Sequence, residues 1–335
     1  MARWLTRYLW RPFETQARRT PFWPLKTVLE EPAPGVVCIR IDNAVTRALS
    51  RLAGGYDYSV TYVLNETVMI DTGFPWAAQA LQRTLMARGW DRTIRTVINT
   101  HYHEDHIGNN DVVAGVCDAR FLGSAATAAA ARLPPPLPWY RRFLFGPLHA
   151  ARIEVAPETV MLPGLELQLI ATPGHCPGHV CVFVPEKGWL FSGDLYIAPD
   201  LDTQLPDVDG PDWINSLEKV LALPVTALFD AHGTILHGAD AVHQLLQQKR
   251  DFLCDIQSRV REHLEESTSI EDLSNRVFGS HTLAERLALG DGWLSVLTSA
   301  DFSRHHLIGS FARPMLRELQ RKALESPIRL TDEDY

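Results

Sequence analysis

A dense run of histidines and acids constrains this chain more than any other feature. Positions 100–106 read Thr-His-Tyr-His-Glu-Asp-His, directly after the apolar stretch Thr96–Ile98 and Asn99. Histidine and aspartate at this density make poor core material, because buried polar groups need partners. They are common ligands of divalent metal ions. The spacing His-x-His-x-Asp-His therefore predicts a metal site at the end of a buried strand.

The composition fits a folded protein with a sizeable core. The 335 residues are 46% apolar and 21% charged, as in ordinary soluble proteins. No apolar run approaches the roughly 20 residues of a membrane-spanning helix, and arginines interrupt the N-terminus where a signal peptide would be apolar. We therefore expect residence in the cytoplasm, with a peripheral membrane position as the alternative.

Charge and cysteine usage exclude some other classes of protein. The net charge of −8 argues against nucleic acid as a partner, because phosphate binding normally needs a basic face. The five cysteines are scattered and form no Cys-x-x-Cys pair. They predict neither a disulfide framework nor a thiolate metal site.

The N-terminal residues differ in charge from the rest of the chain. Residues 1–26 hold six Arg or Lys and the single acid Glu14. We predict a basic, aromatic arm over residues 1–35 that packs on the body of the protein. A peripheral membrane contact or a protein contact through residues 1–26 is the alternative, and a homodimer is also kept open.

Short β-type runs alternate with helical stretches between residues 36 and 238. A hairpin is expected where Tyr58–Leu64 and Thr67–Ile70 flank Asn65 and Glu66. Strand runs separated by helices predict a layered α/β domain over 36–238. The other expected strands are 36–41, 96–98, 119–122, 159–162, 166–171, 180–184, 189–192 and 227–229, and the expected helices are 75–88, 124–132 and 212–221.

Two further segments have their own character. Nothing from Ala239 onward has a strand pattern, and amphipathic stretches at 241–264 and 307–324 predict an all-helical extension over 239–335. Residues 134–150 combine several prolines with the aromatic and basic cluster 139–143. This composition predicts a long loop, or a helix carried on a proline-rich stalk.

Three candidate ligands recur later in the chain in the same context. His175, Asp194 and His232 each come directly after a strand-like run and beside a glycine, which lets the backbone turn tightly next to a metal. Two metal ions held close together need about six protein donors plus a bridging group. Together with the first run, the candidate ligands are His101, His103, Asp105, His106, His175, Asp194 and His232.

The ordered motifs resemble the metallo-β-lactamase-fold hydrolase superfamily over roughly residues 36–238. The resemblance implies a four-layered αββα sandwich with two metal ions at the edge where the two sheets meet. It rests on Asp71-Thr72-Gly73, the run at 101–106, Thr172-Pro173-Gly174-His175, Gly193-Asp194 and His232-Gly233.

The same resemblance implies a role for each candidate. His101, His103 and His175 would bind the first metal ion, Asp105, His106 and His232 the second, and Asp194 would bridge both. Asp71 would not bind metal but would fix the ligand loop through hydrogen bonds, as carboxylates next to metal ligands do. His179 would have a structural role. Zinc is the expected metal, with iron and manganese as alternatives that accept this mixture of ligands.

The expected chemistry is hydrolysis. Two divalent ions that share a water lower its pKa from 15.7 toward about 7. We expect Asp105 to orient this nucleophile and to help move a proton to the leaving group. Two branches of the superfamily differ from this chain at candidate ligands. β-Lactamases carry cysteine or serine in place of Asp194, and flavodiiron proteins usually carry glutamate in place of His103. We therefore expect neither activity here.

A second resemblance indicates the substrate. The segment His306–Ser310 and the helix that continues to Leu324 are similar to the tail of the quinolone-signal-response thioesterase branch. We therefore favour an acyl thioester or related small ester as the substrate. A lactonase, a lipid or other phosphodiesterase, and a regulator that retains the metal site are the alternatives. The expected substrate contacts are Trp139, Tyr140, Phe143, Tyr196 and His306.

Overall fold

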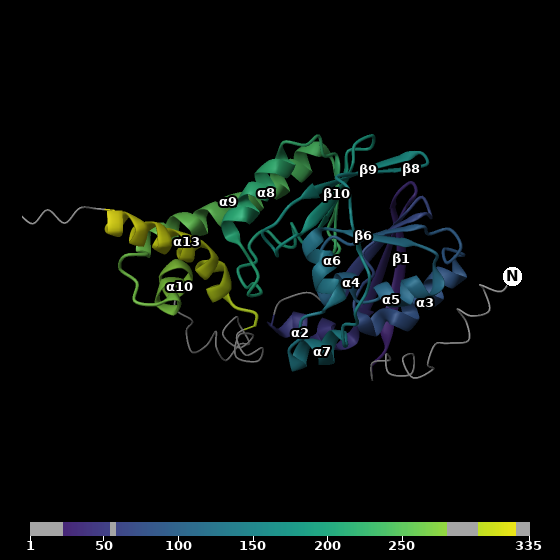
Figure 1. Ribbon diagram of the computed structural model, residues 1–335, viewed down its shortest axis with the longest axis horizontal. Coiled ribbons are helices and arrows are strands. Elements are labelled where there is room, and N and C mark those ends of the chain that lie inside the picture. The colour runs from purple at the N-terminus through teal and green to yellow at the C-terminus, as the bar shows by residue number, and fades with distance from the viewer. Residues whose placement is uncertain (1–22, 54–57, 280–300, 326–335) are drawn as a thin grey trace, which may run out of the picture. The chain divides into compact units, whose positions relative to one another are not determined.

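The chain forms two compact units. The computed structural model describes residues 23–53, 58–279 and 301–325. The first unit comprises residues 1–171, 178–197 and 226–238, and the second comprises 172–177, 198–225 and 239–335. All the described strands belong to the first unit, and the second is built of helices and loops (Figure 1).

A seven-stranded sheet forms one layer of the first unit. Its strands follow chain order, with antiparallel pairing from β1 to β4 and parallel pairing from β4 to β7. Asn65 and Glu66 adopt positive φ angles of 45° and 58° in the predicted hairpin turn. The strands are β1 (Leu25–Ala33), β2 (Val36–Asn43), β3 (Tyr58–Leu64), β4 (Val68–Ile70), β5 (Thr96–Ile98), β6 (Arg120–Gly123) and β7 (Glu154–Val155).

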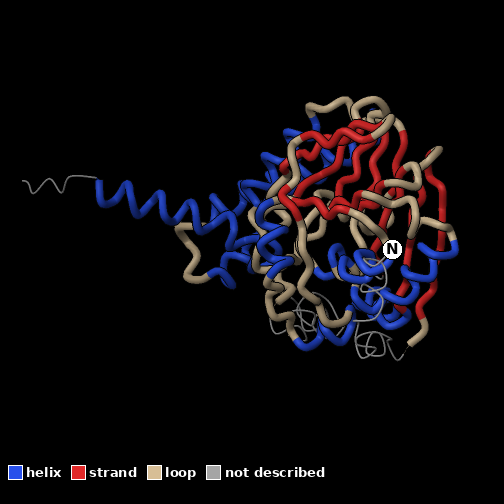
Figure 2. The backbone as a smooth tube through the Cα atoms, turned by 45° about the vertical axis from the view of Figure 1, so that its right-hand side comes forward, coloured by secondary structure: helices blue, strands red, loops and turns tan. Residues whose placement is uncertain are grey.

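A six-stranded sheet forms the second layer of the same unit (Figure 2, strands in red). Its order is β13-β12-β11-β10-β9-β8. Only the pair β11 and β12 is parallel among the described pairs of this sheet. The strands are β8 (Thr159–Leu162), β9 (Leu165–Ala171), β10 (Val180–Val184), β11 (Trp189–Gly193), β12 (Ala227–Asp230) and β13 (Ile235–His237).

The alternation of side chains along the strands creates two cores. Successive residues of a strand point to opposite faces, so Tyr62 of β3 packs among residues of both sheets while Val63 packs toward the helices. The ring of Tyr62 meets Phe191 at 5.2 Å and Phe229 at 5.8 Å between centroids. These contacts hold the two sheets face to face.

Helices cover the outer face of the first sheet. Leu81 and Leu85 join the outer core from one helix and Ala131 from another. Ser124 caps the latter helix by accepting the Thr127 N–H at 3.1 Å. The helices of this unit are α2 (Ala44–Ala53), η1 (Pro75–Ala77), α3 (Ala78–Ala87), α4 (Glu104–Ile107), α5 (Asn110–Val116), α6 (Ala125–Arg132) and α7 (Trp139–Phe145).

The second unit packs four described helices around its own apolar core. Ser310 accepts the backbone N–H of Gly210 at 2.9 Å, and a Cβ on Gly210 would lie 2.3 Å from the ring of Phe311. Glycine is therefore needed where these helices cross. None of the helices in the described ranges has the length and apolarity to cross a bilayer. The four are α8 (Gly210–Leu221), α9 (Ala239–His263), α10 (Ile270–Phe278) and α13 (Arg304–Glu325).

The predicted fold class is confirmed, and one boundary is corrected. Two sheets and their helices are present, and the described part of residues 239–335 contains the helices α9, α10 and α13. Residues 25–33, which we assigned to the N-terminal arm, form β1 and pair with β2. This strand lies at the sheet edge and is largely exposed, so it lacks the apolar alternation of a buried strand. The remainder of the predicted arm, residues 1–22, lies outside the described residues.

Candidate metal centre

Two pairs of parallel strands bring the candidate residues to strand ends that lie side by side. β4 and β5 are parallel neighbours, and they lead into Asp71 and the run that begins at His101. β11 and β12 are also parallel, with Gly193 opposite Asp230, and they lead into Asp194 and His232. The carboxyl ends of parallel strands are the usual place for a site in an α/β fold.

Asp194 lies at the centre of a cluster in the first unit. Its Oδ1 is 3.3 Å from His106 Nε2. Its Oδ2 is 3.4 Å from His232 Nε2 and 3.9 Å from His101 Nε2. One carboxylate thus faces three imidazole rings, which is the position expected of a bridging ligand.

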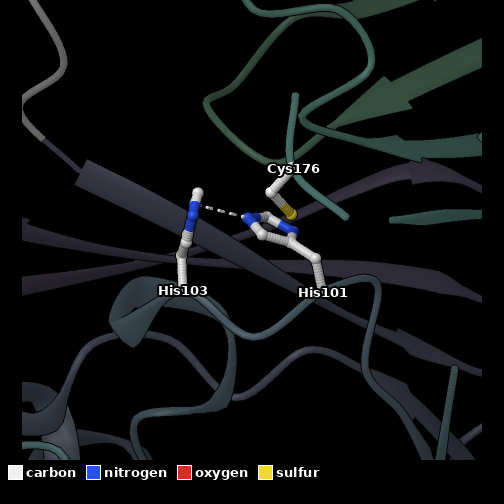
Figure 3. A group of neighbouring side chains, drawn as sticks. All are labelled: His101, His103 and Cys176. Carbon is white, nitrogen blue, oxygen red and sulfur yellow. Dashed lines mark hydrogen bonds between the residues drawn. The ribbon is translucent and has the colours of Figure 1, made fainter. Parts of the chain in front are cut away.

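Asp105 and His103 complete the cluster within this unit. Asp105 Oδ1 lies 3.7 Å from His106 Nε2, and its Oδ2 lies 3.8 Å from His232 Nε2. His103 Nδ1 lies 3.0 Å from His101 Nε2, and Figure 3 marks this contact between the two rings with a dashed line. Six of the seven candidate ligands therefore meet in the first unit.

Asp71 holds the ligand run in place from an unusual backbone conformation. Its φ is 59°, in the left-handed region where aspartate is tolerated better than most residues. Its Oδ1 accepts the Thr100 N–H at 2.8 Å, and its Oδ2 accepts the Thr100 hydroxyl at 2.7 Å. Oδ2 also accepts His106 Nδ1–H at 2.8 Å. Because Nδ1 donates to Asp71, His106 presents Nε2 to the cluster. Carboxylates that do not bind the metal themselves often orient metal-binding histidines in this way.

His232 is oriented by the backbone. Its Nδ1 donates to the Tyr58 carbonyl oxygen at 3.0 Å, so Nε2 is the nitrogen that faces the carboxylates. Asp230 accepts the backbone N–H groups of His232 at 2.8 Å and of Thr234 at 2.7 Å. Burial raises the pKa of Asp230 to about 6 against the effect of these hydrogen bonds.

His179 supports the loop that carries Asp194. The backbone N–H of Asp194 donates to His179 Nε2 at 3.0 Å. A Cβ on Gly193 would lie 2.7 Å from that nitrogen and 2.9 Å from Thr100 Cβ. Only glycine therefore lets β11 turn at this point, and the contact is the one that a structural role for His179 requires.

The carboxylates set the protonation of the rings around them. Burial would lower the pKa of His232, but Asp194 and Asp105 raise it to about 9. Burial would also lower the pKa of His106. The nearby carboxylates of Asp194, Asp105 and Asp71 instead raise it well above its ordinary value. Burial would raise the pKa of Asp105, yet the two imidazoles lower it. In the absence of metal, the carboxylates therefore favour the protonated form of His106 and His232.

The donor set fits divalent metal ions. Imidazole nitrogen and carboxylate oxygen are ligands that zinc, iron and manganese share. Within the described part of the chain, His106 Nε2 is buried and has no well-directed hydrogen bond, although Asp194 Oδ1 lies 3.3 Å away. A cation between these atoms would satisfy both. Asp105, His106 and His232 also form a compact group of ligand atoms.

One pair beside the cluster has no counterpart in the sequence analysis. Glu104, which stands between two candidate ligands, is buried and accepts Arg141 Nε–H at 2.7 Å. A second hydrogen bond from Arg141 Nη2 makes the pair bidentate. The partners lie 37 residues apart in the chain, so no local pattern could have revealed the contact.

The remaining candidate ligand lies in the second unit. His175 is part of the loop 172–177, and its ring packs edge-on against Trp213 with centroids 5.8 Å apart. A Cβ on Gly174 would lie 2.3 Å from Trp213 Cα, so this loop needs its glycine. Cys176, also labelled in Figure 3, belongs to the same loop. Metal binding by His175 stays a prediction.

The predicted substrate contacts differ in exposure. Trp139 and Phe143 of α7 are 71% and 51% exposed, while Tyr140 and Tyr196 are buried. His306 is partly exposed in the first turn of α13, in the second unit. A substrate contact by any of these five side chains also stays a prediction.

Comparison with known proteins places the chain in a family. The model of the Metallo-beta-lactamase superfamily matches residues 54–266, well over half of the chain. The chain therefore belongs to this superfamily, as its motifs predicted. It is a metal-dependent hydrolase, in agreement with the donor set at the centre of its first unit.

Individual relatives extend this result. The chain is 27% identical over 261 residues to Beta-lactamase-like protein 2 homolog from Caenorhabditis elegans, covering 74% of this chain and 81% of that protein. It is 30% identical over 159 residues to hydroxyacylglutathione hydrolase from Rhodospirillum rubrum, covering 47% of this chain and 55% of that enzyme. The match thus spans about half the length of the latter relative.

A solved structure shares the fold over nearly the whole chain. The Beta-lactamase domain protein from Burkholderia ambifaria is similar with a TM-score of 0.60 and 17% identity, covering 93% of this chain and 94% of that one. At this identity the similarity shows the fold alone.

Proposed function

We propose that this protein uses two divalent metal ions to hydrolyse an acyl thioester or a related ester. The position of Asp194 carries the proposal, because its two oxygens face His106, His232 and His101. A shared carboxylate suits two ions, whereas β-lactamases of this fold carry cysteine or serine there. The relatives named hydroxyacylglutathione hydrolase support the choice of substrate, since an acylglutathione is a thioester.

The proposed ligand set follows the sequence motifs. His106 and His232, with Asp105, would bind one ion, and Asp194 would contact both. The other ion would be bound by His101 and His103 together with His175, which enters the set from its motif alone. We propose zinc as the metal, with iron and manganese as the alternatives to be tested by metal analysis.

Asp105 is the residue that we assign to proton transfer. When bound, the metal ions supply a water of lowered pKa and a positive charge that polarises the acyl carbonyl. The side chain of Asp105 is 19% exposed, against 5% for Asp194. Asp105 is therefore the more accessible carboxylate of the cluster. It can orient the attacking water and pass a proton to the departing thiolate or alkoxide.

A substrate panel tests the proposal. Metal-replete protein would be assayed with acyl-CoA, acylglutathione, lactone and phosphodiester substrates, and we expect thioesters to be turned over fastest. Turnover of phosphodiesters alone would refute the acyl assignment. The variant Asp105→Asn should lower kcat on the order of 10³-fold. The matched variant Asp91→Asn, at a partly exposed carboxylate that pairs with Arg92, should retain full activity.

A further inference from the structure

A stretch free of acids runs through the first unit. Between Asp118 and Glu154 the sequence holds five arginines and neither aspartate nor glutamate, although the whole chain carries a net charge of −8. Arg120 pairs with Glu154 at 2.8 Å, and Arg141 pairs with buried Glu104. Arg132 and Arg142 form no ion pair with any of the described residues, and both are exposed. Positive charge therefore remains at the surface around α7.

The inner side of α7 is held firmly. Arg141 makes its bidentate contact with Glu104. Trp76 Nε1 donates to the Phe143 carbonyl oxygen at 2.9 Å, and Asn43 Nδ2 donates to the Leu144 carbonyl oxygen at 2.8 Å. Three points of attachment over one short helix fix its orientation on the unit. Its exposed side chains are thus presented in a fixed arrangement.

The outer side of α7 combines large apolar groups with positive charge. Trp139 and Phe143 are four residues apart, so they share one helical face, and they are 71% and 51% exposed. Exposed Arg142 lies beside them in the chain. Leu133, just before the prolines that lead into the helix, is 83% exposed. We call Leu133, Trp139, Arg142 and Phe143 the α7 outer face.

One further aromatic residue contacts this face. The ring of Trp23, the first described residue, meets Phe143 with centroids 5.0 Å apart. The 22 residues that precede Trp23 contain five arginines and only one acid, Glu14. A basic stretch of sequence therefore immediately precedes the residue that contacts Phe143.

We propose that the α7 outer face docks the protein onto an anionic lipid surface. Exposed tryptophan and phenylalanine beside arginine is the combination that binds at the headgroup level of a bilayer. Anionic headgroups add attraction for each nearby arginine. A symmetric dimer through this face would place Arg142 and its basic neighbours against their own copies, which like-charge repulsion opposes. The proposal does not depend on the substrate of the metal centre.

Vesicle flotation of the full-length protein tests this docking. We expect binding to vesicles of phosphatidylcholine mixed with phosphatidylglycerol, little binding to phosphatidylcholine alone, and release as salt is raised. The double variant Trp139→Ala/Phe143→Ala should weaken binding on the order of a hundredfold. Arg142→Glu should weaken it on the order of tenfold.

The control changes exposed apolar residues elsewhere in the same unit. Met86 and Met161 are 58% and 69% exposed, so Met86→Ala/Met161→Ala removes similar exposed surface and should bind vesicles like the wild type. Melting temperatures would verify that each variant is folded. The proposal is overturned if the wild type binds no anionic vesicles, if neutral vesicles bind equally well, or if both double variants lose binding equally. Retained binding by the Trp139/Phe143 variant would also overturn it.

Discussion

Two regions of this molecule bury ionisable side chains, one as a cluster of opposite charges and the other as a single amine. In the first unit, imidazoles and carboxylates gather around Asp194 and leave His106 Nε2 without a well-directed hydrogen bond among the described residues. In the second unit, Lys249 of α9 is fully buried. Its amine donates to the Leu201 carbonyl oxygen at 3.3 Å and lies 5.0 Å from the centroid of the Trp213 ring.

The difference separates a cluster that favours protonated imidazoles from a single amine whose charged form is disfavoured by burial. Asp194 and Asp105 raise the pKa of His232 to about 9, so this region retains protons that a metal ion would displace. Burial lowers the pKa of Lys249 to about 7, so that amine loses its proton more easily. The metal-free protein should therefore respond to pH in opposite directions in the two regions.

Replacing the central carboxylate should have the largest effect. Asp194→Asn removes the charge that faces three imidazoles, and we expect turnover to fall on the order of 10³-fold or more. Metal analysis should show fewer bound ions per chain than in the wild type. Asp240→Asn, in the first turn of α9, serves as the control. Full metal content in the Asp194 variant would contradict its bridging role.

Metal removal should make stability depend on pH with a defined sign. The pKa of His232 is raised from 6.5 to about 9, so its contribution to the free energy of unfolding is fully present below pH 6.5 and is lost as pH rises through about 9. Over this range, stripped protein should lose a few kcal/mol relative to metal-loaded protein, since the opposite contribution of Lys249 is common to both. Urea unfolding of stripped and metal-loaded protein at both ends of the range would measure this difference. A difference that does not change with pH would show that carboxylates do not hold these protons.

Loosening the support of the ligands should have a moderate effect. Asp71→Asn weakens the hydrogen bonds to Thr100 and His106 and should lower metal affinity by roughly 10- to 100-fold. Competition with a chelator would measure the change. Asp91, a partly exposed carboxylate that pairs with Arg92, again provides a matched Asp→Asn control, which should bind metal normally.

The smallest expected effect concerns the buried amine. The pKa of Lys249 is lowered from 10.5 to about 7, so its burial penalty is complete below pH 7 and disappears as pH rises toward 10.5. Lys249→Met should therefore stabilise the protein by about 1–4 kcal/mol at pH 6 and by less at high pH. Arg250→Met changes the neighbouring, more exposed cation and should show no such pH dependence. A pH-independent loss of stability in the Lys249 variant would contradict this interpretation.

The sequence predicted those parts of the site that lie in local motifs. The ligand run follows the strand Thr96–Ile98, and both Asp194 and His232 follow parallel strands, as their glycine-flanked motifs suggested. Periodicity alone could locate these strands because they are buried and apolar. It could not find β1, an exposed edge strand, and it missed the two- and three-residue strands β7 and β13.

Contacts between distant residues could not be predicted in this way. The pairing of Glu104 with Arg141 depends on how a proline-flanked helix packs against the ligand run. The edge-on contact of His175 with Trp213 likewise depends on packing within the second unit. Neither contact produces a pattern of residue spacing in the sequence, because each partner alone is an ordinary charged or aromatic residue.

The structure places two independent requirements on the residue at position 71. Its backbone has a φ of 59°, which glycine or asparagine would adopt readily. Its side chain must also offer two charged oxygens at short reach to Thr100 and His106. Glycine meets only the first requirement, and glutamate meets the charge but not the conformation. In a library that samples all twenty amino acids here, selection for activity should therefore return aspartate almost alone.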